Sequence, residues 1–314
     1  MAKVVTVTLN PCLDKTLCVS ELKSGEVNRA QKSMLDAGGK GINVSRALTN
    51  FGVDNVAMAI VGGDSGELLE KLLKDEGVEY DFLKCQGETR TNYKIFDEVS
   101  GDTTDINEPG ITISQTVLEE FKQRFGKNLQ GAEYAVLAGS IPPGVKSNIY
   151  AELIDEANKA GVKVILDTTG ERLSEGIKAK PFAIKPNIHE LEEVIGKKLK
   201  NSSELLEELR EMTKSGIELV TVSMGADGAI FMKGNVAYKA GTLPVEVKSA
   251  VGCGDSVVAG IVYSLLSGFD LKKTAMISAA AGGITATKDG TNMCTADEVL
   301  KSYTNISIDR IEYL

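Results

Sequence analysis

The sequence predicts an α/β fold with a doubly wound, mostly parallel sheet and a small separate β-sheet that serves as a lid. Three observations lead to this prediction. From residue 114 onward, short apolar strands alternate with amphipathic helices, as in a chain of βα units. Polar residues follow directly after several strands, where sheets of this kind bind ligands. Two polar strands within 91–107 interrupt the alternation and do not fit the main sheet.

Composition and charge exclude several classes of protein. The 314 residues carry a net charge of −9, so no basic surface is expected for nucleic acid. No apolar run is long enough to span a membrane, and the chain enters a strand pattern without a signal peptide. Five scattered cysteines indicate reduced thiols in a cytoplasmic protein. With a single histidine, His189, general-base chemistry is left to a carboxylate.

The first third of the chain supplies strands and a glycine-rich turn. Strands are predicted over 4–9, 17–19, 27–30 and 56–61, and a helix over 65–75. The strands at 91–96 and 103–107 are expected to join the pieces at 17–30 in the lid. Between them, Gly38, Gly39 and Gly41 permit close backbone approach at a helix start, where Lys40 and Asn43 share one face. The spacing matches neither a P-loop nor a dinucleotide fingerprint.

The remaining elements follow the βα rhythm. Helices are predicted over 114–126, 147–160 and 203–214, strands over 134–138, 162–166, 182–185 and 219–223, and two helices over 254–268 and 271–287 close the fold. The polar residues at strand ends are Asn10, Ser140, Asp167, Asn187 and Ser223. Their position favours a role in ligand binding.

A tight turn over 250–256 is the strongest candidate for chemistry. Gly252 and Gly254 flank Cys253, so that successive N–H groups point into one concavity at a helix start, which suits an anion. Asp255 lies in the first helical turn. The nest would stabilise a phosphoryl group in transfer while Asp255 takes a proton from the attacking hydroxyl. The alternative is a helix cap in which the glycines serve only the turn.

Three other candidates have equally simple structural alternatives. Asn187 and Glu190, three apart at a helix start, are suited to hydrated Mg²⁺ or to a reciprocal capping box. The 223–228 loop is either a nucleotide-phosphate loop or a hairpin turn. Arg90, at the base of the lid, either grips a substrate phosphate or is a solvated charge.

Three motifs occur in order along the chain. They are Gly38-Gly39-Lys40-Gly41-x-Asn43, Asn187-x-x-Glu190 and Gly252-x-Gly254-Asp255. Together they resemble the ribokinase-like carbohydrate kinases, and within them the phosphofructokinase B group, over essentially the whole chain. Segments 8–14, 88–90 and 104–110 resemble the ketose-phosphate kinases of that group more than ribokinase.

The resemblance implies a single ribokinase-like kinase domain over residues 1–314, with lid strands drawn from about 15–32 and 90–108. It implies ATP-dependent phosphoryl transfer with Mg²⁺, with fructose 1-phosphate as acceptor and fructose 1,6-bisphosphate as product. Tagatose 6-phosphate is the alternative acceptor, and a non-catalytic sugar-phosphate sensor is a more distant alternative. The family's lid strands often pair between subunits, which implies a homodimer.

The resemblance also implies a role for each matching residue. Asp255 would be the catalytic base, and Gly252, Cys253 and Gly254 the anion hole. The substrate would be held by Asp14, Arg29, Gly38, Gly39, Lys40, Asn43, Arg90, Asn107 and Ser140, with Lys40, Arg29, Arg90 and Ser140 on its phosphate. ATP would be bound by Lys185, Asn187, Ser223, Gly225 and Gly228, and the metal by Asn187 and Glu190 through waters.

Two departures from the family pattern affect these expectations. Ser249, Ala250 and Val251 stand where many members carry Asp-Thr, so potassium activation is not assumed. Cys253 occupies a position that is often Ala or Ser. A thiol beside a helix N-terminus is expected to have a lowered pKa, and we therefore expect sensitivity to alkylating reagents.

Overall fold

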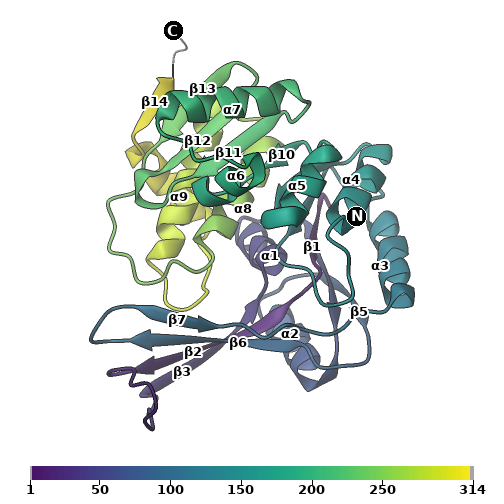
Figure 1. The fold of residues 1–314 in the computed structure, drawn as a ribbon, viewed down its shortest axis with the longest axis vertical. Helices are drawn as coiled ribbons and strands as arrows, with labels where there is room; N and C mark the ends of the chain where they lie inside the picture. Colours follow the sequence, from purple (N-terminus) through teal and green to yellow (C-terminus); the bar gives the residue numbers. More distant parts are fainter. Residues whose placement is uncertain (1, 312–314) are drawn as a thin grey trace.

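The computed structural model describes residues 2–311 and divides their strands between two sheets (Figure 1). The main sheet has ten strands in the order β14-β13-β12-β11-β10-β9-β8-β1-β4-β5. Their bounds are β1 (Val4–Thr8), β4 (Asn55–Val61), β5 (Tyr80–Lys84), β8 (Tyr134–Ala138), β9 (Lys163–Asp167), β10 (Ala183–Ile184), β11 (Leu219–Ser223), β12 (Ala229–Lys233), β13 (Val236–Ala240) and β14 (Ile308–Ile311).

Most neighbours in the main sheet are parallel, which confirms the predicted fold class. The run from β5 to β11 is parallel throughout, whereas β12, β13 and β14 are antiparallel. Strand β5 and these last three strands were not predicted from the sequence. The two predicted helices therefore do not close the fold, since another helix and β14 follow them.

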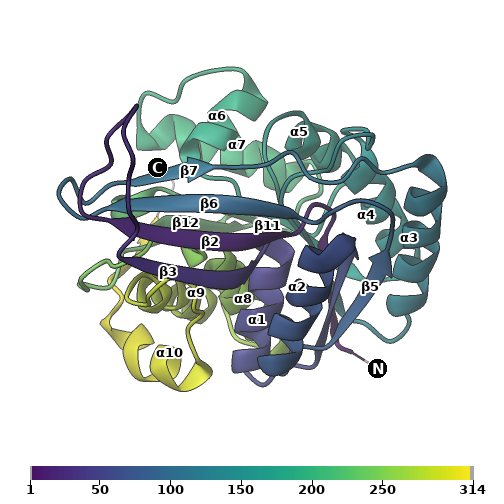
Figure 2. The ribbon, with the colours of Figure 1, turned by 90° about the horizontal axis from the view of Figure 1, so that it is seen from below.

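Helices cover both faces of the main sheet (Figure 2). One layer consists of α3 (Gln115–Asn128), α4 (Ile149–Lys159), α5 (Gly170–Lys178), α6 (Ile188–Ile195) and α7 (Ser202–Lys214). The other consists of α1 (Lys40–Asn50), α2 (Gly63–Asp75), α8 (Cys253–Leu266), α9 (Leu271–Ala286) and α10 (Ala296–Ser302). Because both faces are covered, β1, β4 and β8 are buried along their whole length and their sequences are almost entirely apolar.

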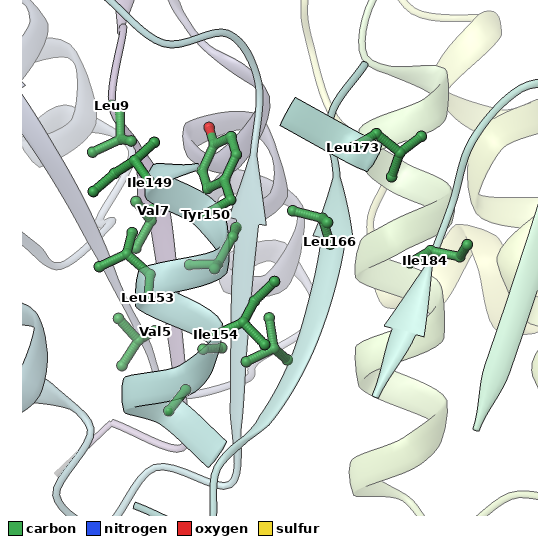
Figure 3. Packing of buried hydrophobic residues seen from close by; sticks show 14 of the residues in the cluster. Val5, Val7, Leu9, Ile149, Tyr150, Leu153, Ile154, Leu166, Leu173 and Ile184 are labelled. Atoms are coloured by element: carbon green, nitrogen blue, oxygen red, sulfur yellow. The ribbon is translucent and has the colours of Figure 1, made fainter. Parts of the chain in front are cut away.

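The packing of α4 shows how this core positions a functional loop. Its apolar residues recur three and four apart, so that Leu153 and Ile154 pack in one cluster with side chains of β1 and β9 (Figure 3). Tyr150, fully buried in the same cluster, donates its hydroxyl to the carbonyls of Ala138 and Gly139 at 3.1 Å. The turn that carries Ser140 is therefore anchored to the core.

The second sheet, called the lid sheet below, has the strand order β3-β2-β6-β7. Its strands are β2 (Cys12–Val19), β3 (Lys32–Gly38), β6 (Arg90–Asp97) and β7 (Thr103–Ile106). It lies below the main sheet in Figure 1 and crosses the molecule in Figure 2. Only residues 9–11 separate β1 from β2, so the lid sheet starts directly at the carboxyl end of a central strand.

The strand predicted over 27–30 is wrong. Those residues lie in an exposed loop, and the strand that pairs with β2 is Lys32–Gly38. The cause is the exposure of the lid sheet: β3 is solvated over most of its length and lacks the apolar alternation that marks a half-buried strand. Among residues 2–311, no helix combines the length and apolar character needed to cross a bilayer.

Candidate active site

A cavity of about 600 Å³ lies between the carboxyl ends of the central strands and the lid sheet. Its walls come from β2, β6, the starts of α1 and α8, and the turns after β8 and β9. The predicted site residues that line it are Asp14, Gly39, Lys40, Asn43, Arg90, Asn107, Ser140, Lys185, Gly252, Gly254 and Asp255. Residues separated by up to 247 positions, from Thr8 to Asp255, thus share one cavity, as the position of the motifs at strand ends predicts.

The glycines before α1 allow the helix start to press against β1. A Cβ at Gly41 would lie 2.5 Å from the carbonyl oxygen of Val7, so no side chain fits there. The Thr8 hydroxyl accepts a hydrogen bond from the Ile42 amide at 2.8 Å and fixes the helix start. This close packing directs Lys40 and Asn43 into the cavity.

Asp255 is placed by a turn that only glycine can make. Gly252 has φ 78°, and a Cβ there would lie 2.6 Å from the Met293 side chain. Helix α8 begins at the next residue. The amides of Gly254 and Asp255 have no acceptor within the helix, whereas the Cys253 amide donates to the Ala250 carbonyl at 3.5 Å. Asp255 lies in that turn with 6% exposure and lines the cavity. The Asn43 side-chain amide donates to its Oδ2 at 2.8 Å.

The surroundings of Asp255 suit a proton acceptor. Burial raises the pKa of this carboxyl to about 6, Lys40 and the Asn43 hydrogen bond oppose the rise, and Asp167 adds to it. A carboxylate with a pKa near the working pH is ionised in neutral solution and basic enough to take a proton as a bond forms. The helix start beside it presents N–H groups to an anion.

A buried carboxylate holds two lysines in the middle of the cavity. Asp167, the last residue of β9, is 1% exposed and lies 3.1 Å from the Lys40 Nζ and 3.3 Å from the Lys185 Nζ. Burial alone would raise the pKa of Asp167, but Lys185 and Lys40 outweigh it and hold the pKa below its usual range. The pKa of Lys40 is raised by Asp167, Asp255 and Glu190 against the effect of burial. Lys40 is therefore charged.

Asp167 was predicted to have no role beyond its place at a strand end, and Lys40 was predicted to bind the substrate phosphate. In the structure Lys40 is bound to Asp167. The signal for Asp167 was available, since an aspartate directly follows three apolar, buried residues, Val164 to Leu166, at the end of the strand.

Arg90 lies elsewhere in the cavity, at the start of β6. Its Nη2 donates to the Asn10 carbonyl at 3.0 Å and to the Ser140 hydroxyl at 3.4 Å, and its Nη1 donates to the Glu108 carbonyl at 2.9 Å. Its buried Nε has no hydrogen-bond partner. Within residues 2–311 these contacts are all to neutral oxygens. The positive charge is thus left available for an anion in the cavity.

The cavity face of β6 adds two residues that sequence reasoning missed. Arg90, Asn92 and Lys94 are two apart on the strand and all line the cavity. Lys94 Nζ lies 3.4 Å from Oδ1 of Asp14 on the neighbouring strand β2. The alternation of polar residues from Arg90 onward was the signal that could have found them.

Two predicted substrate residues do not line the cavity. Arg29 lies in the exposed loop between β2 and β3, so a single chain does not bring it to the cavity. Gly38 ends β3 behind Asp14, and a Cβ at this position would lie 2.7 Å from the Asp14 carboxyl carbon. Gly38 thus leaves room for the side chain that faces the cavity.

Asn187 and Glu190 form the reciprocal capping box that was the alternative explanation of their spacing. Asn187 Oδ1 accepts from the Glu190 amide and Glu190 Oε2 accepts from the Asn187 amide, both at 2.8 Å. The 223–228 loop begins next to Asn187, through a parallel bridge from Asn187 to Ser223. Gly228 has φ 83°, and a Cβ there would lie 2.0 Å from the Ala240 carbonyl oxygen, so the turn itself requires glycine. In the described part of the chain, these residues lie outside the cavity lining.

The expected lowering of the Cys253 pKa is wrong. Burial, followed by the charge of Asp255 and the nearby Cys294, raises the pKa of the Cys253 thiol to about 11. The side chain also lies 3.6 Å from the Ser249 carbonyl, to which the thiol donates. The helix N-terminus does not overcome a neighbouring carboxylate and the loss of water.

We therefore expect iodoacetamide at pH 7 to leave Cys253 unmodified and activity unchanged, because the reactive thiolate is scarce. Peptide mass spectrometry after timed exposure measures the modified fraction at each cysteine. Partly exposed Cys85 is the internal reference for reagent access. Alkylation of Cys253 faster than Cys85, with parallel loss of activity, would contradict this expectation.

The fold and the site together define a phosphotransferase of the ribokinase-like class, with a buried carboxylate at a helix start beneath a β-sheet lid. Residues 7–298 match the family described as pfkB family carbohydrate kinase. The chain belongs to this family, whose members use ATP as a substrate and transfer its phosphoryl group to an alcohol.

Named relatives cover nearly the whole chain. The 1-phosphofructokinase of Borreliella burgdorferi is 36% identical over 309 residues, 98% of this chain and 99% of its own length. The 1-phosphofructokinase of Bacillus subtilis is 35% identical over 283 residues, 90% of this chain and 92% of its own. Among solved structures, phosphofructokinase-2 from Escherichia coli in complex with potassium superposes with a TM-score of 0.91 at 30% identity, covering 97% of this chain and 99% of that chain.

Proposed function

We propose that this protein is a cytoplasmic fructose-1-phosphate kinase, which transfers the terminal phosphoryl group of ATP to the C6 hydroxyl and forms fructose 1,6-bisphosphate. One observation carries the proposal: a single cavity holds an arginine whose contacts among the described residues are all to neutral oxygens and, separately, a buried carboxylate of raised pKa. A substrate with a phosphate at one end and a reacting hydroxyl at the other satisfies both. The relatives named 1-phosphofructokinase favour this acceptor over tagatose 6-phosphate.

The substrate's existing phosphate is bound at the lid side of the cavity. Arg90 supplies the charge, the Ser140 hydroxyl lies within its reach, and Asn107 lines the same cavity. Asp14 and Asn43 contact sugar hydroxyls, with Gly39 leaving space for the ring. Lys94 neutralises Asp14, and it also provides a donor to a hydroxyl between the two ends.

Phosphoryl transfer takes place at the start of α8. Asp255 accepts the proton of the C6 hydroxyl as its oxygen bonds to phosphorus and the bond from phosphorus to the ADP oxygen breaks. The amides of Gly252, Cys253 and Gly254 stabilise the charge on the transferred group. A Cβ at Gly254 would lie 3.5 Å from the Lys185 Nζ, so this lysine stands directly beside the helix start.

The charges in the middle of the cavity also support the involvement of Mg²⁺. Lys40 and Lys185 are balanced by Asp167 and Asp255, so this group offers no net positive charge to a polyphosphate. Within residues 2–311 no cluster of three or more metal-ligating side chains is present. Asn187 and Glu190 fit a cation that keeps its waters, since the capping box uses only one Glu190 oxygen and the charge of Glu190 reaches Lys40. Bound there, Mg²⁺ would neutralise charge on the ATP phosphates. The adjoining loop with Ser223, Gly225 and Gly228 would contact the nucleotide.

We also propose that residues 1–314 act as one kinase domain and that two copies pair through their lid sheets. Large apolar side chains are exposed on and around this sheet, namely Val27, Leu35, Val99 and Ile106. Burying them between copies would remove apolar surface from water. Light scattering should give twice the mass of 33.4 kDa. Leu35→Glu and Ile106→Glu should convert the protein to the monomer, whereas the matched exposed change Leu300→Glu on α10 should not.

A coupled ADP-release assay tests the acceptor. Fructose 1-phosphate, tagatose 6-phosphate, fructose 6-phosphate and fructose are compared by kcat/KM at fixed Mg-ATP. We expect fructose 1-phosphate to be preferred by about a hundredfold, which corresponds to about 2.7 kcal/mol of transition-state binding. Preference for tagatose 6-phosphate would keep the mechanism and replace the acceptor. Binding without turnover of any of them would indicate a sugar-phosphate sensor.

The pH profile is expected to show the ionisation of Asp255. Because the pKa of this carboxyl is raised to about 6 and only its ionised form accepts a proton, kcat/KM should fall about tenfold per pH unit below pH 6. The second pKa of the substrate phosphate is also about 6. Asp255→Glu distinguishes the two ionisations. The substitution changes the pKa of the enzyme's carboxyl, and with it the acid limb of the pH profile, but it leaves the pKa of the substrate phosphate unchanged. An acid limb identical in both enzymes would contradict the assignment.

A further inference from the structure

Arg46 is a buried charge that the proposed reaction does not use. It lies one turn after Asn43 on α1 and is 3% exposed. Its Nε and Nη2 donate to the two carboxylate oxygens of Glu76 at 2.6 and 2.8 Å. This two-point pair holds the guanidinium plane in one orientation and leaves Nη1 to face the interior.

The neighbours of that inner nitrogen are all oxygen atoms. Nη1 lies 3.2 Å from the Ala37 carbonyl, 3.4 Å from Asn43 Oδ1, and 3.0 and 3.1 Å from the carbonyl and hydroxyl of Thr291. Only an acceptor is stable against a cationic nitrogen. The Asn43 amide must therefore present its oxygen to Arg46 and its NH₂ to Asp255 Oδ2, which it reaches at 2.8 Å.

Rotating the Asn43 side-chain amide by half a turn would make its contacts with both Arg46 and Asp255 unfavourable. Its NH₂ would face the guanidinium, and its oxygen would face the ionised carboxylate. Because both contacts would be repulsive, Arg46 selects the orientation in which Asn43 donates to the proton acceptor. The contact to Thr291 connects the same nitrogen to the loop before α10.

We propose that Arg46 is a positioning residue that locks the Asn43 amide as a donor to Asp255 and so keeps the catalytic carboxylate ionised. This inference rests on the proposed function, because it takes Asp255 as the proton acceptor. The other charged and titratable groups that act on Asp255 are Lys40, Lys185, Asp167 and Cys253. All of them remain in place when Arg46 is changed, so a change in the ionisation of Asp255 reports the loss of Arg46, through both its charge and its hold on the Asn43 amide.

The test follows Asp255 without turnover. In two-dimensional ¹⁵N–¹H spectra, the Asn43 side-chain NH₂ signal, identified by its loss in Asn43→Ser, is titrated from pH 4 to pH 9 in the full-length enzyme. The wild-type midpoint is expected near 6. In Arg46→Met we expect the midpoint to rise by about one unit, because the donor to the charged form is no longer held. The acid limb of kcat/KM should move with it, lowering activity at pH 6 about tenfold relative to pH 8.

Two variants control the result. Glu76→Gln keeps Arg46 and its Nη1 contacts and should titrate as wild type. Arg46→Lys keeps the charge, so its titration midpoint should lie close to the wild-type value. If Arg46→Met does not fold, Arg46→Gln, which keeps length and polarity without charge, takes its place with the same expected rise. A folded neutral variant with an unchanged midpoint overturns the inference. Since the titration needs no substrate, that failure is distinct from a failed turnover assay, which would overturn the proposed function.

Discussion

Replacing Asp255 with asparagine is expected to lower kcat by about three orders of magnitude while ATP binding stays near wild type. Asparagine has the shape of aspartate but cannot accept the hydroxyl proton. The amides of the α8 start and Lys185 remain, so the anion site is preserved. ADP release under saturating substrates measures kcat, and calorimetry measures the affinity for ATP. The Asn43 contact is also weakened, since two amide groups then face each other.

A matched control for this change is Asp270→Asn. Asp270 caps α9 at an exposed position and accepts from the Lys273 amide, a role that asparagine fills equally well. This variant removes the same charge from the chain, so its kcat should equal that of the wild type. A kcat for Asp255→Asn within tenfold of this control would refute the base assignment.

The sequence was informative where one residue type serves one purpose. Gly252, Gly254 and Asp255 lie at a helix start as expected, because a glycine turn followed by an apolar run has few other structures. The strand ends were also informative, since Asn10, Ser140 and Asp167 meet in one cavity. Parallel topology alone brings such residues together, whatever their separation along the chain.

The sequence was uninformative where one residue pattern is typical of two different structures. Asn187 and Glu190 are a capping box by geometry, and the pattern that suggests a metal site is identical. Lys40 illustrates a second limit, because its partner Asp167 is 127 residues away and no local pattern pairs them. The error at Cys253 has the same origin, since burial and the facing carboxylate arise only when α8 packs.

The lid sheet was hardest to predict because its strands are solvated. Apolar alternation marks a strand with one buried face, and β7 is exposed along its whole length. Yet polar alternation on β6 places Arg90, Asn92 and Lys94 on the one face of the strand that lines the cavity. In a lid, the residues that bind ligand are the very ones that weaken the strand signal.

Arg90→Gln should raise the KM for fructose 1-phosphate by about 150-fold and leave the KM for ATP unchanged. A charged hydrogen bond to phosphate contributes about 3 kcal/mol. Its loss weakens binding equally in the ground state and in the transition state, so KM rises. Initial rates with each substrate varied in turn separate the two constants. Arg124→Gln is the matched control, because this arginine of α3 pairs with Asp81 of β5 and with Glu120 of its own helix, outside the cavity.

Arg90 also connects the lid sheet to the turn after β1 through the carbonyls of Asn10 and Glu108, so its replacement also loosens the lid sheet. Loosening the lid and losing the phosphate contact change different kinetic constants. Loosening the lid would impair closure over both substrates and lower kcat, and it would lower Tm. Loss of the phosphate contact changes one KM. Arg90→Lys, which keeps the charge without the two-sided contacts, should recover part of the fructose 1-phosphate affinity. Equal losses for both substrates, unrelieved by lysine, would show that Arg90 acts on the lid and not on the phosphate.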